Sequence, residues 1–307
     1  MTLAADRPLP NSTLAAAGLI LAYAVMVTYA DNFVQVIASE GGLWQFQMLR
    51  TAMGLGIFGV LALVVRMRFR PRNWRGVLAR SAVHSGAMLF YFASLGFLPV
   101  AQAVAGLFTA PIFVLLIGRF VYGHALGPVR IGAVAAGFVG VILVLAPEAD
   151  APAGWASLLP VAAGALYALA NIALREWCPG ESAESLTLVY MVLIGIAGAA
   201  GMAILWLFPQ PVPDGTDGFI LRGPVWFSAE ALWWTLVQAA ASVGGVFCMV
   251  RAYQLAEASR VAVFEYVLLP VAAIWAWLLW GQGVGATAAL GMVLIVTAGV
   301  AIALRAR

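Results

Sequence analysis

The sequence predicts an all-α polytopic membrane protein with ten transmembrane helices. Of its 307 residues, 64% are hydrophobic and only 9% are charged, and the mean hydropathy is +0.99. A soluble chain would have roughly a quarter of its residues charged. Two further observations support this fold class: arginine gathers in alternate connections, and the two halves of the chain carry similar landmarks.

Ten apolar segments follow one another along the chain. A helix of about 20 residues crosses the hydrocarbon core of a bilayer, and most of these segments reach that length. The connections between them are mostly short, so consecutive segments are expected to pack as antiparallel hairpins. The segments cover approximately 13–37, 44–65, 78–98, 100–118, 129–147, 155–176, 185–208, 229–254, 259–280 and 284–304.

Arginine sets the predicted orientation, because loops rich in this residue stay in the cytoplasm. The connection after the second segment carries Arg66, Arg68, Arg70, Arg72, Arg75 and Arg80. The opposite side receives acids: Glu40, Glu148, Asp150, Asp214 and Asp217. Ten crossings with both termini in the cytoplasm fit this pattern. The sequence therefore predicts a multi-pass protein of the cell inner membrane, with 209–228 as a long exterior loop.

Two shifts of the sequence align its halves. A shift of 139 residues places Asn32 on Asn171, and a shift of 159 places Pro111 on Pro270. An internal repeat of this kind is typical of transporters, whose sites lie where the repeats meet. The chain is therefore expected to consist of a first five-helix repeat, residues 1–150, and a second one, residues 151–307. Because five is odd, the second repeat is inverted.

The ninth segment contains the most informative polar group, Glu265. A buried acid costs about 2.5–3.5 kcal/mol on insertion scales, so it needs a partner or a use. Pro270 has no N–H, so the carbonyl of Tyr266 is expected to lose its helical partner and to join Glu265 in a polar site. Glu265 is interpreted either as an acid that joins helices, or as a group that binds a substrate amine or carries a coupling proton. Pro111 and Pro270 are expected to act as hinges.

Two charged residues lie nearer the exterior in the first two segments. Asp31 is interpreted as an interfacial acid or a partner for Arg50, or alternatively as part of a gate. Arg50 is interpreted as a structural ion pair, as a side chain that reaches the headgroups, or as a gate.

The remaining predicted cavity residues occur at helical spacing. His84, Met88 and Tyr91 share one face of the third segment. His84 is either a packing residue or a group that binds a carboxylate or carries a proton. We expect His84, Tyr91, Gln238 and Ser242 to face one aqueous cavity. The amides Asn32 and Asn171, together with Tyr167, either line this cavity or join helices.

The sequence lacks the motifs of several classes of function. There is no cofactor loop, no metal-ligand spacing and no catalytic constellation, and the net charge of +3 does not suggest nucleic acid. A membrane enzyme that uses scattered residues is the alternative from another class. Ala136 and Gly140 place small residues four apart, which favours close helix packing. The fifth and tenth segments are therefore expected to pack within a monomer or to form a homodimer interface.

In this order of spans, with Asn32, Arg50, Pro111 and Pro270 at these positions, the chain resembles the ten-helix EamA-type members of the drug/metabolite transporter superfamily. The resemblance covers nearly the whole chain. It implies a substrate cavity lined by the first, third, fourth, sixth, eighth and ninth helices, with the fifth and tenth at the periphery. It points to a branch similar to the aromatic amino-acid exporters.

The function expected on these grounds is secondary transport. The protein would export small metabolites, most of all amino acids, by alternating access around a central site. An importer of a related solute is the main alternative. The expected partners are a small-molecule substrate and membrane lipid, with no cofactor.

Overall fold

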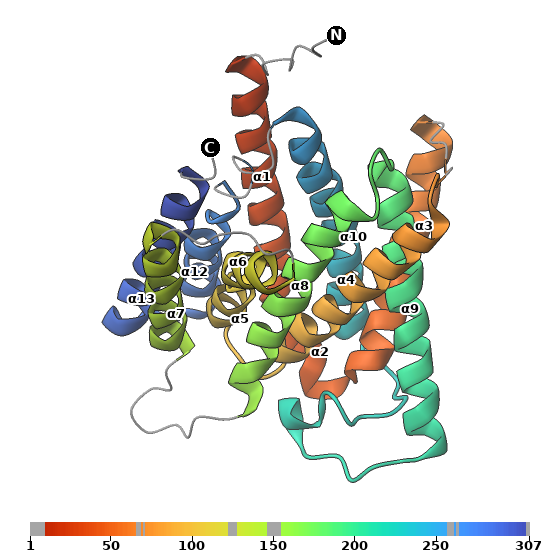
Figure 1. Cartoon of the computed structure of the whole chain (residues 1–307). Coiled ribbons are helices and arrows are strands. Elements are labelled where there is room, and N and C mark those ends of the chain that lie inside the picture. Colours follow the sequence, from red (N-terminus) through yellow and green to blue (C-terminus); the bar gives the residue numbers. More distant parts are fainter. Residues whose placement is uncertain are drawn as a thin grey trace.

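The computed structural model describes residues 10–65, 69, 71–121, 128–145, 155–256, 261 and 264–304, and all regular secondary structure in these ranges is helical. The helices stand side by side as a bundle (Figure 1). They are α1 Pro10–Asp31, α2 Val34–Glu40, α3 Leu43–Val65, α4 Trp74–Leu95, α5 Val100–Leu107, α6 Ala110–Phe120, α7 Pro128–Leu145, α8 Leu158–Glu176, α9 Ala183–Leu207, α10 Ala229–Leu255, α12 Leu268–Trp280 and α13 Ala286–Leu304, with 3₁₀ turns at Trp155–Ser157 and Gly215–Gly218.

The lengths and surfaces of these helices are those of a polytopic membrane protein. Five helical stretches are long and apolar enough to cross a bilayer: Leu14–Glu40, Leu43–Val64, Trp155–Leu174, Ala183–Leu207 and Ala229–Met249. Shorter apolar helices lie in α5 and α6, α7, α12 and α13. Large apolar side chains such as Leu63, Phe138 and Trp277 are exposed on the outer faces, which a soluble monomer would avoid. The 22-residue helix α4 is not among the long apolar stretches, because it carries many polar side chains.

Several chain crossings are interrupted. A turn at Asn32 and Phe33 separates α1 from α2, and a turn at Phe108 and Thr109 separates α5 from α6. A third turn, at Tyr266 and Val267, precedes α12. Two of these breaks are the ones that the prolines of the sequence indicated. A proline is tolerated in the first turn of a helix, where its missing N–H has no helical partner in any case.

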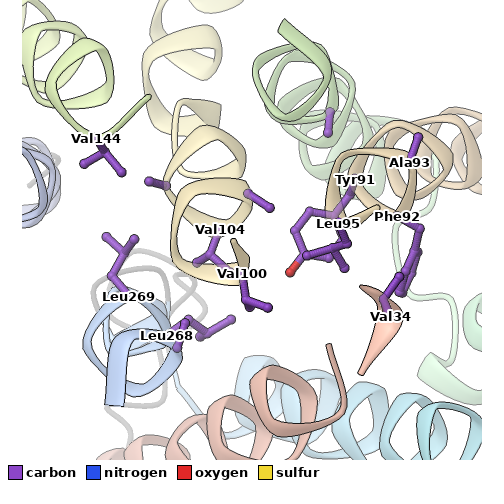
Figure 2. Packing of buried hydrophobic residues seen from close by; sticks show 14 of the residues in the cluster. Val34, Tyr91, Phe92, Ala93, Leu95, Val100, Val104, Val144, Leu268 and Leu269 are labelled. Carbon is purple, nitrogen blue, oxygen red and sulfur yellow. The ribbon is translucent and has the colours of Figure 1, made fainter. Parts of the chain in front are cut away.

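Helix packing brings the two ends of the chain together. α1 lies against α10 and α12, α4 against α8 and α9, and α3 against α9 and α10. α5 contacts α8 and α12. α7 packs along α13, and a Cβ atom on Gly140 would come within 2.7 Å of the carbonyl oxygen of Gly291, so glycine allows the close approach. The main core gathers Val34, Tyr91, Phe92, Val104, Leu268 and Leu269 between these helices (Figure 2).

The connection between α9 and α10, residues 209–228, packs against α2 and the start of α3. Phe219 is fully buried, and its carbonyl accepts the N–H of Leu43 at 2.7 Å. The Arg222 guanidinium donates to the carbonyls of Ala38 and Gly41 at 2.8 and 2.9 Å, where the last carbonyls of α2 need donors. Ser228 donates to Glu40 at 2.6 Å. We call this end of the bundle, at the bottom of Figure 1, the capped end.

Two expectations need correction. Arg80 was placed in a loop, but it lies two turns inside α4, because α4 begins at Trp74 with Asn73 as its N-cap. The Tyr266 carbonyl was expected to be free, but it accepts the Leu269 N–H at 3.3 Å. The 209–228 connection is a long, mostly exposed loop, and it contributes Phe219 to the core. Arg66, Arg68, Arg70, Glu148 and Asp150 lie outside the described residues.

Candidate functional site

Asp31 is the centre of a buried polar layer. It is the last residue of α1, and its carboxylate accepts two hydrogen bonds: one from the Tyr91 hydroxyl of α4 at 2.6 Å and one from the Gln238 amide of α10 at 2.7 Å. All three side chains are buried. The layer therefore ties together three helices that come from both halves of the chain.

Arg50 of α3 extends this layer. Its Nη1 donates to the Ser242 hydroxyl of α10 at 2.9 Å, and its Cζ lies 4.1 Å from the ring centroid of Phe92, a cation–π distance. Its charge also acts on Asp31. The interior cavity beside Arg50 and Ser242 measures about 10 Å³, room for roughly one water molecule.

These contacts narrow the alternatives for the two charged residues without separating a structural pair from a gate. Asp31 is not an interfacial acid and Arg50 does not reach the headgroups, because both side chains are buried inside the bundle. Asn32 is held locally, since its amide donates to the Thr28 carbonyl at 2.7 Å at the end of α1.

A second group of residues is aromatic and lies away from the capped end. The His84 ring of α4 meets the Tyr190 ring of α9 edge-on at 4.7 Å and the Tyr167 ring of α8 at 5.6 Å. The Tyr167 hydroxyl lies 3.9 Å from the sulfur of Met249 and also interacts with Asn171. Tyr167, Asn171 and Met249 are only half-buried. Because rings dominate this group of residues, we call it the aromatic chamber.

Glu265 and Tyr266 come to this chamber from the segment before α12. Both are buried, and the Tyr266 ring lies 5.1 Å from the Phe108 ring. The charge of Glu265 acts on Tyr23 of α1 and on Tyr167. The broken connections at Phe108 and Tyr266 thus face each other, and the predicted hinge residues Pro111 and Pro270 lie in the first turns of the helices that follow, α6 and α12.

The predicted cavity residues therefore divide into two sets. The layer holds Asp31, Arg50, Tyr91, Gln238 and Ser242. The chamber holds His84, Tyr167, Asn171, Glu265 and Tyr266. Tyr91 and His84 share a helix but belong to different sets. Met88 lies on the same helix as these two residues and packs against two separate apolar clusters.

Sequence reasoning missed several members. Phe92 was not recognised as the platform for Arg50, and Tyr190 was not among the predicted site residues although its ring packs on His84. Arg80, one turn before His84, is buried instead of lying in a cytoplasmic loop. The position of an aromatic residue in a transmembrane segment does not indicate which side chain of another helix it contacts. These contacts therefore could not be predicted from residue spacing.

In the ranges that the structure describes, no three His, Cys, Asp or Glu side chains gather closely enough to hold a metal ion. The side chains of the layer are mutually bonded, and those of the chamber combine ring faces, an amide and an acid. Such groups suit the reversible binding of an organic solute.

Comparison with known proteins finds transporters. Residues 14–146 match the EamA-like transporter family. A riboflavin transporter of Rhizobium johnstonii is 30% identical over 85% of this chain and 79% of its own length. A riboflavin transporter of Brucella anthropi is 26% identical over 65% of this chain and 66% of its own. An uncharacterized transporter of Helicobacter pylori is 25% identical over 78% of this chain and 76% of its own.

One solved structure, named only as a crystal structure of a protein, shares the fold. It has a TM-score of 0.61 and 16% identity, and the match covers 95% of this chain and 96% of that one. The helical bundle, the match to the family and the length of the similarity to named transporters lead to one conclusion. The chain belongs to the EamA-like transporter family of the drug/metabolite transporter superfamily.

Proposed function

We propose that this protein is a secondary transporter of a flat heteroaromatic solute of the riboflavin class, which crosses the inner membrane by alternating access. The observation that carries the proposal is the buried polar layer around Asp31, which lies beside the half-buried Tyr167 and Asn171 of the aromatic chamber. A closed polar layer next to less buried aromatic and amide side chains is the arrangement expected of a transporter with one gate shut.

The proposed architecture is two inverted five-helix halves, residues 1–150 and 151–307. Helix packing supports these two halves. The ten proposed crossings are numbered in chain order. In this numbering α1 and α2 together form one crossing, α5 and α6 form another, and the stretch that ends in α12 forms a third. Packing of α1 on α10 then corresponds to packing of α8 on α4, and packing of α3 on α10 corresponds to packing of α9 on α4. α5 on α8 likewise corresponds to α12 on α1. The halves meet at the layer and at the chamber.

The aromatic chamber supports the substrate class. Ring faces of Tyr167, His84 and Tyr266 can stack on a flat ring system, and such aromatic pairs are favourable beyond the area that they bury. Asn171 adds an amide that can bond to the edge of a heterocycle. Relatives named riboflavin transporters point to the same class, whereas none of the reported relatives is named for amino acids. The proposal therefore replaces the amino-acid export that the resemblance implied.

The direct test is transport by the purified protein in liposomes. We expect saturable movement of riboflavin, recovered chemically unchanged, that an excess of unlabelled riboflavin inhibits and that tryptophan does not. Flux is measured in both directions, because orientation in the membrane does not fix its direction. Empty liposomes are the control. Absence of saturable riboflavin movement, or inhibition by tryptophan alone, would contradict the proposed substrate class.

The proposed orientation places the capped end outside the cell. Single cysteines are introduced in place of Arg72 and Asp214, both exposed, in a background that lacks Cys178 and Cys248. A membrane-impermeant maleimide applied to intact cells should label the cysteine at 214 and spare the one at 72. Labelling of both from outside would overturn the orientation.

A further inference from the structure

We propose that Arg80, Ser81 and His84 form a binding site for an anionic group, a carboxylate or a phosphate, on a small solute. The site deepens the proposed transport function and rests on it. It lies in the first three turns of α4, between the α8–α9 connection and the aromatic chamber.

The carrying observation is a set of buried polar atoms without partners. Arg80 and His84 are each 7% exposed and Ser81 is 0% exposed. Within the described ranges, Arg80 Nε, Ser81 Oγ and His84 Nδ1 have no hydrogen-bond partner. Three such atoms within two helical turns are unusual, because buried polar groups in native proteins are nearly always bonded.

The other buried or half-buried arginines behave differently. Arg50 donates to Ser242 and lies over Phe92, and Arg222 donates to three carbonyl oxygens. Among the described residues, the groups that interact electrostatically with Arg80 are Tyr167, Cys178 and Tyr190, and none of them is a carboxylate. A buried guanidinium without a counter-charge is strongly unfavourable. The structure therefore leaves this positive charge for a ligand to balance.

The donor geometry selects the class of ligand. A guanidinium offers a planar fork of N–H groups that matches the two oxygens of a carboxylate or a phosphate. The Ser81 hydroxyl and the His84 ring each provide one further donor at neighbouring positions. The rings of Tyr167 and Tyr190 pack on His84, so an aromatic portion of the same solute could extend into the chamber.

The test uses the purified full-length protein in a neutral detergent, with riboflavin and its 5′-phosphate as matched probes. Fluorescence titration should give an affinity for the phosphate ester that Arg80→Gln weakens about tenfold or more, equivalent to about 1.4 kcal/mol. The affinity for riboflavin should change less than about twofold. Arg75→Gln is the matched control, because Arg75 is an exposed arginine on the same helix.

A second measurement is independent of flavin transport. Inorganic phosphate, compared with chloride at equal ionic strength, should raise the unfolding temperature of the wild type and of Arg75→Gln, but not of Arg80→Gln. Without phosphate, Arg80→Gln should be at least as stable as the wild type, because it removes an unbalanced charge. Ser81→Ala retains the charge and should reduce the phosphate effect if Arg80→Gln does not fold.

The outcomes separate the two proposals. Phosphate protection that depends on Arg80, together with no flavin binding, retains the anion site and overturns the flavin class. Equal protection of wild type and Arg80→Gln, or none in either, overturns the anion site. A lower unfolding temperature of Arg80→Gln without anions, together with undiminished phosphate protection of Ser81→Ala, marks Arg80 as structural and also overturns it. Protection by phosphatidylglycerol but not by phosphate assigns the site to lipid and overturns the solute proposal.

Discussion

The two ends of the bundle differ in how their buried polar groups are hydrogen-bonded. Toward the capped end, Asp31, Arg50 and Arg222 are bonded to other side chains or to carbonyls of this chain. Toward the start of α4, the polar atoms of Arg80, Ser81 and His84 have no partner among the described residues. Gln47 is an exception near the capped end, but it is a neutral amide, whose burial costs less than that of a charge.

This difference indicates which buried polar groups stabilise the fold and which are available to bind a solute. Groups that are fully bonded within the chain hold one conformation, whereas unbonded groups beside the half-buried residues of the aromatic chamber are available to a solute. We propose on this basis that the capped end is a closed gate and that the opposite half loads the solute. Changes at the capped end should therefore alter stability and gating, and changes at the opposite half should alter binding.

The largest effect on stability is expected at Asp31. Asp31→Ala removes an acceptor of two hydrogen bonds and leaves the buried Arg50 charge without its nearby acid. Each buried donor left unpaired costs about 1–3 kcal/mol, so a clearly lower unfolding temperature in detergent is expected, together with loss of transport. Asp217→Ala, at an exposed acid, should match the wild type. If Asp31→Ala were as stable as the wild type, the layer would not stabilise the closed bundle.

A smaller effect is expected at Arg222, which joins the 209–228 connection to α2. Arg222→Gln loses charge-assisted hydrogen bonds to the carbonyls of Ala38, Gly41 and Gly215, so the connection should loosen by about 1.5–3 kcal/mol. A cysteine in place of the buried Ser94 reports this loosening. Its reaction with a water-soluble maleimide should be faster in Arg222→Gln. Unchanged labelling would mean that the connection does not close this end.

The smallest effect is expected at Phe92, whose ring lies beside the Arg50 guanidinium. Phe92→Leu retains an apolar side chain but removes the cation–π contact, which contributes about 0.5–2 kcal/mol. A modest drop in unfolding temperature is expected. Phe90→Leu, at an exposed position of the same helix, is the matched control. Equal shifts in both variants would show that Arg50 gains nothing from the ring.

Much of the fold was readable from hydropathy. The apolar runs predicted helix ends within a few residues for α3, α7 and α9, and the prolines at 111 and 270 lay beside two helix breaks. The start of α4 was misplaced because its arginines were counted as loop residues. The signal that could have corrected this was Asn73, a good N-cap whose side chain accepts the Gly76 N–H.

The site was harder to predict than the fold. Spacing placed His84, Met88 and Tyr91 on one face, but the turn of the helix against its neighbours sends Tyr91 to Asp31 and His84 to Tyr190. Such contacts join residues far apart in sequence and depend on helix rotation, which periodicity does not fix. The packing of Phe219 was hidden for a similar reason, since a Pro- and Gly-rich composition predicts a loop whether or not it docks.

The most direct measurement concerns the capped end as a moving gate. Ser228 at the start of α10 donates to Glu40 at the end of α2, so cysteines in place of these two residues would link the two halves of the chain. A short bismaleimide that joins both cysteines should stop riboflavin movement in liposomes, while each single cysteine treated in the same way should transport normally. Undiminished transport by protein that mass spectrometry shows to be fully cross-linked would contradict the account.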